Sequence, residues 1–257
     1  MIGRRDGPAL LGLSAGLAVA VVLAQVAYPL TDGEPLRLLT IATVLCFTAA
    51  SLTHATATRG LRWALGLLGL AGAIGLLAEA VGVRTGVPFG RYAYDDSLGP
   101  KLLDVPIIVP LAWVMMSYPC LLLGRRLGRR QPVWTALTGG FTLAAWDLFL
   151  DPQMVAAGRW AWTYPQPELP GVPGVPVTNF VGWLAVAIVM VAVLDALLPR
   201  VPNAREGVPA ALLGWTWIGS TIGNAIFFDR PAVAVWGGIA MGVFTAPYLV
   251  SWHRSHP

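Results

Sequence analysis

Apolar runs of about 20 residues follow one another along the whole of this 257-residue chain. A helix of that length spans the hydrocarbon core of a bilayer. Only 12% of the residues are charged, against about 25% in soluble domains, and the mean hydropathy is +0.67. We therefore predict one all-α integral-membrane domain over residues 1–257, a multi-pass protein of the cell membrane. About eight spans are expected, at roughly 8–29, 36–54, 61–83, 104–124, 133–151, 178–198, 208–228 and 231–252.

Positive charges are distributed unevenly between the two sides of the predicted bundle. With eight spans and the N-terminus inside, eleven of the 17 Lys and Arg residues fall in inner segments, and the RRLGRR run at 125–130 contributes most. Because cytoplasmic segments carry such an excess, we predict that both termini face the cytoplasm. The first span follows Arg4 and Arg5 and is longer than the apolar core of a signal peptide, so we expect a retained helix. The same arginines explain the pI of about 9.4, and no nucleic-acid partner is expected.

Two connecting segments, 84–103 and 152–177, are longer than turns, and both fall on the predicted outer side. They are rich in Gly, Pro and aromatic residues, and long loops of this kind are binding segments or disordered linkers. Disorder fits poorly, because many large rings would remain in water. Two interpretations stay open: an aromatic belt at the membrane interface, or a lid over a site at membrane depth. The rings are Phe89, Tyr92, Tyr94, Trp160, Trp162 and Tyr164.

The segment WDLFLDPQMV, residues 146–155, places two aspartates near the end of the fifth predicted span. A charge at membrane depth costs at least about 2.5–3.5 kcal/mol. Asp147 and Asp151 are four residues apart and share a helix face. Because like charges repel in a low dielectric, we expect one of the two to stay protonated, which would put an acid beside a base. Two alternatives remain: neutralisation by Arg91 or Arg159, and a transporter proton relay.

Other polar residues are predicted at the same outer depth. Glu79 lies four residues before the end of the third span, and Asn179 begins the sixth. Their convergence beside the aromatic loops predicts a polar site at the outer end of the bundle. Three acidic residues have simpler explanations: a solvated turn for Asp95 and Asp96, and the N-cap of the fourth helix for Asp104.

The chain carries no motif for a bound cofactor. It has no Walker loop, no GxGxxG that opens a helix after a strand, and no DxxxD-type diphosphate site with basic residues in the same loop. The histidines (His54, His253 and His256) and the cysteines (Cys46 and Cys120) lack metal-binding spacing. We therefore expect neither a cofactor nor a metal.

Three ungapped segments carry a family likeness. They are TGVPFGRYAYDDSLGPKLLDVPIIVPLAWVMMSYP (85–119), WDLFLDPQMVAAGRWAW (146–162) and GVPVTNFVGW (174–183). In this order they resemble the integral-membrane carotenoid hydratases, which add water to the terminal double bond of acyclic carotenoid ends, as in bacterioruberin synthesis or γ-carotene 1′-hydroxylation. The likeness is strong over roughly residues 75 to 185, and hydropathy agrees over the remainder.

The resemblance implies acid–base catalysis without a cofactor. An acid protonates C2 of the terminal C1–C2 double bond, a tertiary cation forms at C1, and a base delivers water to it. Asp147 and Asp151 match the family pattern WDLxLDP and are the candidate donor and base, with the deeper Asp147 favoured as the acid. Glu79 is a rival acid, and Asn179 is a candidate for holding the water. The candidate substrate-binding residues are Phe89, Tyr92, Tyr94, Trp113, Met116, Trp146, Trp160 and Trp162.

The implied partners are a carotenoid dissolved in the lipid bilayer and other carotenoid-biosynthesis enzymes. Two alternatives use the same residues differently. A non-catalytic carotenoid or lipid carrier, or a transporter, would keep the aromatic loops and tolerate loss of the carboxylates. A carotenoid end-group cyclase would also begin by protonating a double bond, but carbon would capture the cation in place of water.

Overall fold

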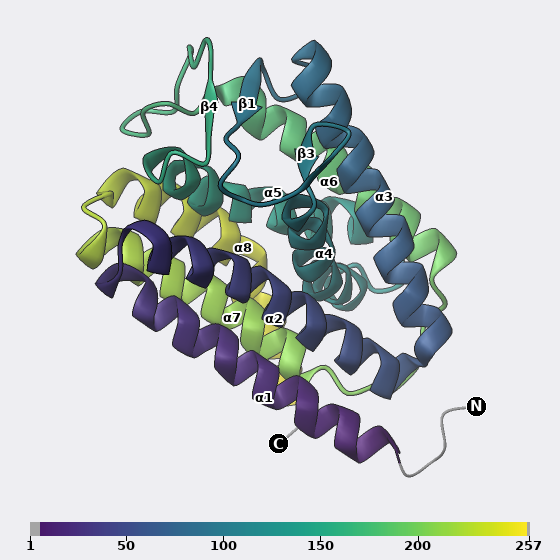
Figure 1. Cartoon of the computed structure of the whole chain (residues 1–257). Helices are drawn as coiled ribbons and strands as arrows, with labels where there is room; N and C mark the ends of the chain where they lie inside the picture. The colour runs from purple at the N-terminus through teal and green to yellow at the C-terminus, as the bar shows by residue number, and fades with distance from the viewer. Residues whose placement is uncertain (1–5, 256–257) are drawn as a thin grey trace.

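Residues 6–255 are described by the computed structural model, and they form a bundle of eight α-helices with the two long loops at one end (Figure 1). Arg4, Arg5 and His256 lie outside the described residues. The prediction of an all-α membrane bundle is confirmed, with four short strands added by the loops. The helices are α1 Asp6–Ala27, α2 Gly33–Arg59, α3 Leu61–Thr85, α4 Ile108–Leu127, α5 Pro132–Ala156, α6 Val177–Leu197, α7 Gly207–Ile222 and α8 Pro231–Arg254, with a 3₁₀ turn η1 at Tyr28–Leu30.

Seven of these eight helices are long and apolar enough to cross a bilayer. The exception is α7, whose 16 residues continue as the π-helical turn η2, Gly223–Phe227. At 1.5 Å per residue α7 reaches only about 24 Å, short of the roughly 30 Å hydrocarbon core. The predicted span 208–228 therefore combines two kinds of helix. The sidedness, with both termini in the cytoplasm, and the cell membrane as the location stay predictions.

Helices α4 and α5 form the centre of the bundle. Their most apolar stretches are 67% and 72% buried, against 11–33% for the other five candidate spans. Glycines let α5 approach both neighbours at backbone distance. A Cβ on Gly140 would lie 2.6 Å from the Cα of Ile188 on α6, and one on Gly139 would lie 2.7 Å from the carbonyl oxygen of Cys120 on α4. The two aspartates of α5 are thereby held in the most enclosed part of the molecule.

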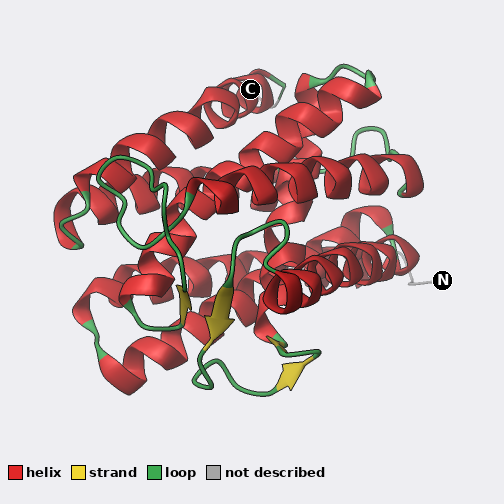
Figure 2. Ribbon diagram, turned by 90° about the horizontal axis from the view of Figure 1, so that it is seen from above, coloured by secondary structure: helices red, strands yellow, loops and turns green. Residues whose placement is uncertain are grey.

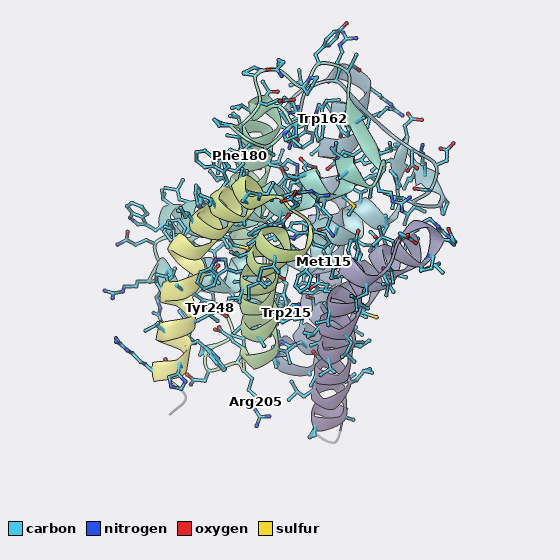
Figure 3. All side chains as sticks on the ribbon, turned by 90° about the vertical axis from the view of Figure 1, so that its left-hand side faces the viewer. Met115, Trp162, Phe180, Arg205, Trp215 and Tyr248 are labelled. Carbon is cyan, nitrogen blue, oxygen red and sulfur yellow. The ribbon has the colours of Figure 1, made fainter. Side chains whose placement is uncertain are left out.

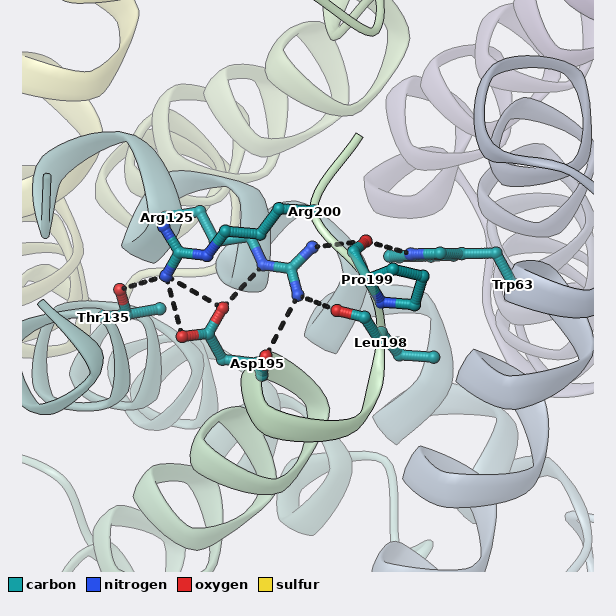
Figure 4. Close-up of polar contacts among 7 residues, drawn as sticks. All are labelled: Trp63, Arg125, Thr135, Asp195, Leu198, Pro199 and Arg200. Atoms are coloured by element: carbon teal, nitrogen blue, oxygen red, sulfur yellow. Dashed lines mark hydrogen bonds and ion pairs between the residues drawn. The ribbon is translucent and has the colours of Figure 1, made fainter. Parts of the chain in front are cut away.

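The arginine end of the bundle is the end at which α4 and α6 stop, at residues 125–127 and 195–200. There Arg125 and Arg200 each place a guanidinium nitrogen 2.8 Å from the Asp195 carboxylate (Figure 4). Trp63 of α3 donates to the carbonyl of Pro199 at 2.9 Å, so three helices are fastened together at this end.

The loop end is the opposite end of the bundle, covered by the strands β1 to β4. Strand β1, Tyr92–Tyr94, comes from the first long loop and pairs antiparallel with β4, Trp160–Trp162, from the second. Tyr92 faces Trp162 in this register and Tyr94 faces Trp160. Strands β2, Lys101–Leu102, and β3, Val105–Pro106, form a hairpin. Seen from above, the strands and loops lie across the helix ends (Figure 2).

The burial of the aromatic rings in the two long loops distinguishes between the two interpretations of these loops, a lid or an aromatic belt at the membrane interface. Phe89, Tyr92, Trp160 and Trp162 are all at least nine-tenths buried, whereas Tyr164 is 73% exposed. The two long loops therefore pair with each other and act as a lid whose inner face is aromatic.

The prediction that Asp104 is the N-cap of the fourth helix is wrong. It does not cap α4, which begins at Ile108; with Leu103 it forms the turn of the β2–β3 hairpin, at φ angles of 70° and 54°. Two left-handed central residues are typical of a two-residue hairpin turn. The apolar residues on both sides of Asp104 hid the hairpin in the sequence. Its carboxylate instead meets Arg84 at 3.2 Å on the surface.

Asp95 and Asp96 do lie in the solvated loop predicted for them. The Asp95 carboxylate accepts a hydrogen bond from Ser97 at 2.7 Å. Asp96 is fully exposed in its side chain, and the ammonium of Lys101, 2.6 Å away, lowers its pKa.

Candidate active site

Asp147 and Asp151 lie one turn apart on α5 and are almost fully buried, with 1% and 3% exposure. Asn179, in the first turn of α6, joins them: its side-chain amide donates to Oδ2 of Asp147 at 2.8 Å and to Oδ2 of Asp151. An Asn side chain has two N–H donors, so both are used on the carboxyl groups. The structure thus brings together the three residues that the sequence placed at one depth. Helix α5 continues to Ala156, so Asp151 lies within the helix and not at its end.

The remaining oxygens of the two carboxyl groups differ. Oδ1 of Asp151 accepts a hydrogen bond from Nε1 of Trp160 in the lid, at 3.0 Å. Oδ1 of Asp147 is buried and has no hydrogen-bond partner among the described residues. A buried acceptor left without a donor costs about 1–3 kcal/mol. Of the four carboxyl oxygens of this pair, Oδ1 of Asp147 is therefore the one that accepts no hydrogen bond from the described residues.

Glu79 on α3 is the third buried carboxyl group, and both of its oxygens are occupied. Oε2 accepts from the hydroxyls of Tyr92 at 2.5 Å and Tyr94 at 2.8 Å, and Oε1 accepts from Nε1 of Trp113 at 3.0 Å. The pKa values of Tyr92 and Tyr94 are raised, mainly by burial and to a smaller extent by the nearby Glu79 carboxyl group, so both hydroxyls stay protonated and can donate. These three donors, from β1 and α4, fix the position of the Glu79 carboxyl group.

None of these carboxyl groups is paired with a cation. The six ion pairs found within residues 6–255 involve other acidic residues. Arg159, a predicted alternative partner, donates to the Ser97 hydroxyl at 2.8 Å. The interpretation in which Arg91 or Arg159 neutralises the aspartates is therefore wrong. The hydrogen-bond donors to the two aspartates, Asn179 and Trp160, are neutral.

Aromatic rings form the walls around the carboxyl groups. Trp113 of α4 and Trp183 of α6 stack with centroids 3.8 Å apart, and Trp146 meets the edge of Trp183 at 6.0 Å. In the lid, Tyr92 lies 5.6 Å from Trp162 and Tyr94 lies 5.5 Å from Trp160. Such faces attract a positive charge when water is excluded.

Two adjoining cavities lie at this level. The small cavity, about 50 Å³, is lined by Glu79, Asp151 and Asn179 together with the rings of the lid and of α4 and α6. The large cavity, about 370 Å³, lies between α1, α2, α5, α7 and η2, and its lining is mostly apolar. Figure 3 shows two of its lining residues, Met115 and Trp215, deeper in the bundle than Trp162 of the lid. Four residues line both cavities: Thr40, Val44, Leu150 and Met154.

The predicted substrate-binding residues divide between the two cavities. Trp146 lines the large cavity, and the small cavity is lined by Phe89, Tyr92, Tyr94, Trp113, Trp160 and Trp162. The prediction that Met116 binds the substrate is wrong. Met116 is fully buried and lines neither cavity, whereas its neighbour Met115 lines the large cavity. One residue along a helix turns the side chain by about 100°, which the apolar pattern alone could not resolve.

Trp183 was missed by the sequence analysis although it contacts three site rings: Trp113, Trp146 and Phe89. Its position four residues after Asn179, on the same face of a helix, was the available signal. Asp147 is close to the site but lines neither cavity, so Asp151 is the aspartate that a ligand in the small cavity would meet.

Within residues 6–255, no group of three or more His, Cys, Asp and Glu side chains is placed to hold a metal ion. The prediction that neither a metal nor another cofactor takes part stays a prediction.

The fold and the site define a class: a multi-helix membrane protein with an uncompensated carboxyl cluster under an aromatic lid, next to an apolar cavity. Residues 38–246 match the family described as carotenoid biosynthesis protein, and the chain belongs to that family. The matched region begins in α2 and ends in α8, so it includes every residue of the site.

One curated relative is similar over part of the chain. It is the bisanhydrobacterioruberin hydratase of Haloarcula japonica, 41% identical over 123 residues. The match covers 46% of this chain and 40% of that relative, so the likeness spans less than half of each protein. No solved structure matches the chain.

Proposed function

We propose that this protein is a carotenoid hydratase, which adds water across the terminal C1–C2 double bond of an acyclic carotenoid end group. The observation that carries the proposal is a cluster of three buried carboxyl groups held by neutral donors only, next to an apolar cavity. A buried carboxyl group can stay protonated at neutral pH and act as the general acid that a hydrocarbon double bond requires. Membership of the carotenoid biosynthesis family and the name of the Haloarcula japonica relative support the same reaction class.

The aspartate pair supplies the proton in this proposal. Because two negative charges one helical turn apart repel each other, the pair shares one proton. Asp151 delivers it to C2, since it is the member that lines the small cavity. The C1–C2 π bond provides the electron pair for the new C–H bond, and C1 becomes a tertiary cation. The oxygen of a water molecule then bonds to C1, and one water proton returns to the pair, so the acid is regenerated.

The rings and Glu79 stabilise the cation. The stacked pair Trp113 and Trp183 presents an aromatic face, and one such contact is worth about 2 kcal/mol or more when water is excluded. In this proposal Glu79 is ionised when the cation forms, and its three donors hold the carboxylate in place. In this role Glu79 is not the rival acid but the counter-charge of the intermediate.

In this proposal the reacting end group and the water molecule meet in the small cavity, which Asp151, Trp113 and Trp183 line. About 50 Å³ is room for a water molecule, whose share of liquid volume is roughly 30 Å³, beside the reacting carbons. The large cavity takes the apolar chain behind the end group, and the rest of the polyene stays in the bilayer. No cofactor is part of this reaction. Other carotenoid-biosynthesis enzymes, whose products dissolve in the same bilayer, are the proposed partners.

Expression in a bacterium that accumulates lycopene, followed by mass spectrometry of the pigment, tests the proposal. The expected result is a mass increase of one water for each modified end. An isomer of unchanged mass would indicate cyclisation, and unmodified lycopene in cells that contain the full-length protein would indicate a carrier. Either of those outcomes overturns the hydratase.

A further inference from the structure

Two residues in the lining of the large cavity carry a polar atom that the proposed reaction does not use and that the protein does not pair. Thr43 of α2 and Asn224 of η2 line it, and both side chains are more than nine-tenths buried. Neither the Thr43 hydroxyl nor Oδ1 of Asn224 has a hydrogen-bond partner among the described residues. Other polar groups of the same lining are matched to each other: Tyr28 with Thr40 at 3.1 Å, and Gln25 with Trp215 at 2.7 Å.

Thr43 is unlike the other threonines of its helix. Thr40, Thr53, Thr56 and Thr58 each donate to the backbone carbonyl four residues earlier, which is the usual way to satisfy a hydroxyl within an apolar helix, and Thr48 donates to the carbonyl of Leu111 on α4. The Thr43 hydroxyl has no such bond among the described residues. The amide nitrogen of Asn224 does bond within its own turn, to the carbonyl of Ser220 at 2.9 Å, and this leaves only its oxygen available.

These two groups define the chemistry of a ligand. Oδ1 of Asn224 accepts only, so the ligand must donate, which a ketone, an ether or a plain hydrocarbon cannot do. Among the described residues no charged side chain lines the cavity, which disfavours an ionic ligand such as a phosphate or an amine. The mouth is rimmed by exposed apolar residues, among them Leu30, Ile222 and Phe227, so the ligand arrives from lipid. A hydroxyl on an otherwise apolar chain satisfies all three conditions.

We infer that Thr43 and Asn224 form a hydroxyl-binding subsite in the large cavity, which recognises an alcohol group on the polyene near its reacting end. The inference rests on the proposed function and adds to it a requirement on the substrate or the product. The hydroxyl has one of two sources: the substrate carries it into the cavity, or the hydration creates it and the subsite receives the hydrated end.

Binding to the purified full-length protein in detergent tests the subsite without turnover. The probes are lycopene and its 1-hydroxy-1,2-dihydro derivative, and the measure is the polyene absorbance that co-elutes with the protein. We expect the hydroxylated probe to bind about two- to tenfold more tightly to the wild type, the effect of one or two hydrogen bonds. Thr43→Val and Asn224→Leu should each bring the ratio toward one, and Thr43→Ser should retain it.

A matched control is available on α8. Thr245 is also fully buried with an unpartnered hydroxyl, but it lines neither cavity. Thr245→Val therefore makes the same chemical change outside the subsite and should leave the binding ratio unchanged. A wild-type ratio of one, a ratio that survives both Thr43→Val and Asn224→Leu, or equal loss in Thr245→Val overturns the subsite.

Kinetics then identify the source of the hydroxyl. If the substrate carries it, Thr43→Val raises KM for an acyclic polyene with a hydroxyl on the reacting end group and leaves KM for lycopene unchanged. If the reaction creates it, the variant weakens inhibition by the hydrated product. Either result supports the subsite. A binding preference that depends on Thr43, in a protein that hydrates nothing, keeps the subsite and rejects the hydratase.

Discussion

The two ends of the bundle hold buried carboxylates in opposite ways. At the arginine end, Asp195 lies between the guanidinium groups of Arg125 and Arg200, both at 2.8 Å, and Glu206 meets Arg126 at 3.1 Å. At the loop end, Asp147, Asp151 and Glu79 receive only amide, indole and phenol donors. At the arginine end each of these two carboxylates is therefore paired with arginine, whereas within residues 6–255 no ion pair includes the carboxyl groups of the loop end.

This difference separates a structural role from a chemical one. A carboxylate that contacts two guanidinium groups joins the helix ends from which they come. Carboxyl groups held by neutral donors can hold a proton or release it, and a cation formed beside them meets no competing positive charge. Three of the donors at the loop end, Trp160, Tyr92 and Tyr94, belong to the lid, because they lie on β1 and β4. The position of the lid and the hydrogen bonding of the carboxyl groups are therefore linked.

The largest effect is expected for Asp151→Asn. The asparagine side chain has the same volume, and its single amide oxygen can accept a hydrogen bond from Trp160 or from Asn179. It has no carboxylic proton to donate. General acid catalysis contributes about 10²–10⁴-fold, so hydration should fall by at least about a hundredfold. The measurement is hydrated lycopene formed per unit of membrane protein, with Asp96→Asn, on the exposed loop, as the control that keeps full activity. Full activity in both Asp147→Asn and Asp151→Asn would contradict the assignment of the pair.

Asp195→Ala should have the second-largest effect, and on stability instead of chemistry. Removing one partner of a buried ion pair costs about 3–5 kcal/mol, because a buried charge is left without its counter-ion. We expect a lower denaturation midpoint in detergent and near-normal turnover per folded molecule. Glu34→Ala breaks an exposed pair with Arg37 and should leave the midpoint unchanged. A folded, fully stable Asp195→Ala protein that fails to turn over would remove the distinction between the two ends.

Trp183→Leu tests the aromatic wall at the loop end. Losing one desolvated contact with the cation, worth about 2 kcal/mol, corresponds to a roughly 30-fold lower kcat. Binding of lycopene should change less, because the ground state carries no charge. Trp134→Leu on the lipid-exposed face of the same bundle is the matched control. Equal losses in kcat and in binding would show that Trp183 only fills space.

Much of the helical frame could be predicted because membrane helices satisfy their own hydrogen bonds and need only length and apolarity. The carboxyl groups could be found because charge inside an apolar run is costly. The equal predicted depth of Asp147, Asp151, Glu79 and Asn179 in the bilayer was enough to predict that they form one candidate site.

What could not be predicted depends on contacts between distant segments. The pairing of Tyr92 with Trp162 joins residues 70 positions apart, and no local pattern encodes that register. The Asp104 turn was hidden because apolar residues flank it, and the choice between Met115 and Met116 depends on helix rotation within the bundle. Asp151 as the cavity-facing aspartate is also a packing result: burial favoured Asp147, but access to the cavity is set by where α3, α4 and α6 leave space.

The smallest effect is expected for Tyr92→Phe, which removes one of three donors to Glu79. Tyr94 and Trp113 still hold the carboxylate, at 2.8 and 3.0 Å, so the counter-charge remains but is less firmly fixed. One hydrogen bond of about 1 kcal/mol corresponds to a roughly fivefold lower kcat, with KM unchanged. Because burial and Glu79 raise the pKa of Tyr92, the loss should be the same at neutral and moderately alkaline pH. Tyr164→Phe changes an exposed tyrosine of the second lid loop and should have no effect. If Tyr92→Phe lost as much activity as Asp151→Asn, Tyr92 itself would be a proton donor, and the loop end would contain a second acid in place of an anchored anion.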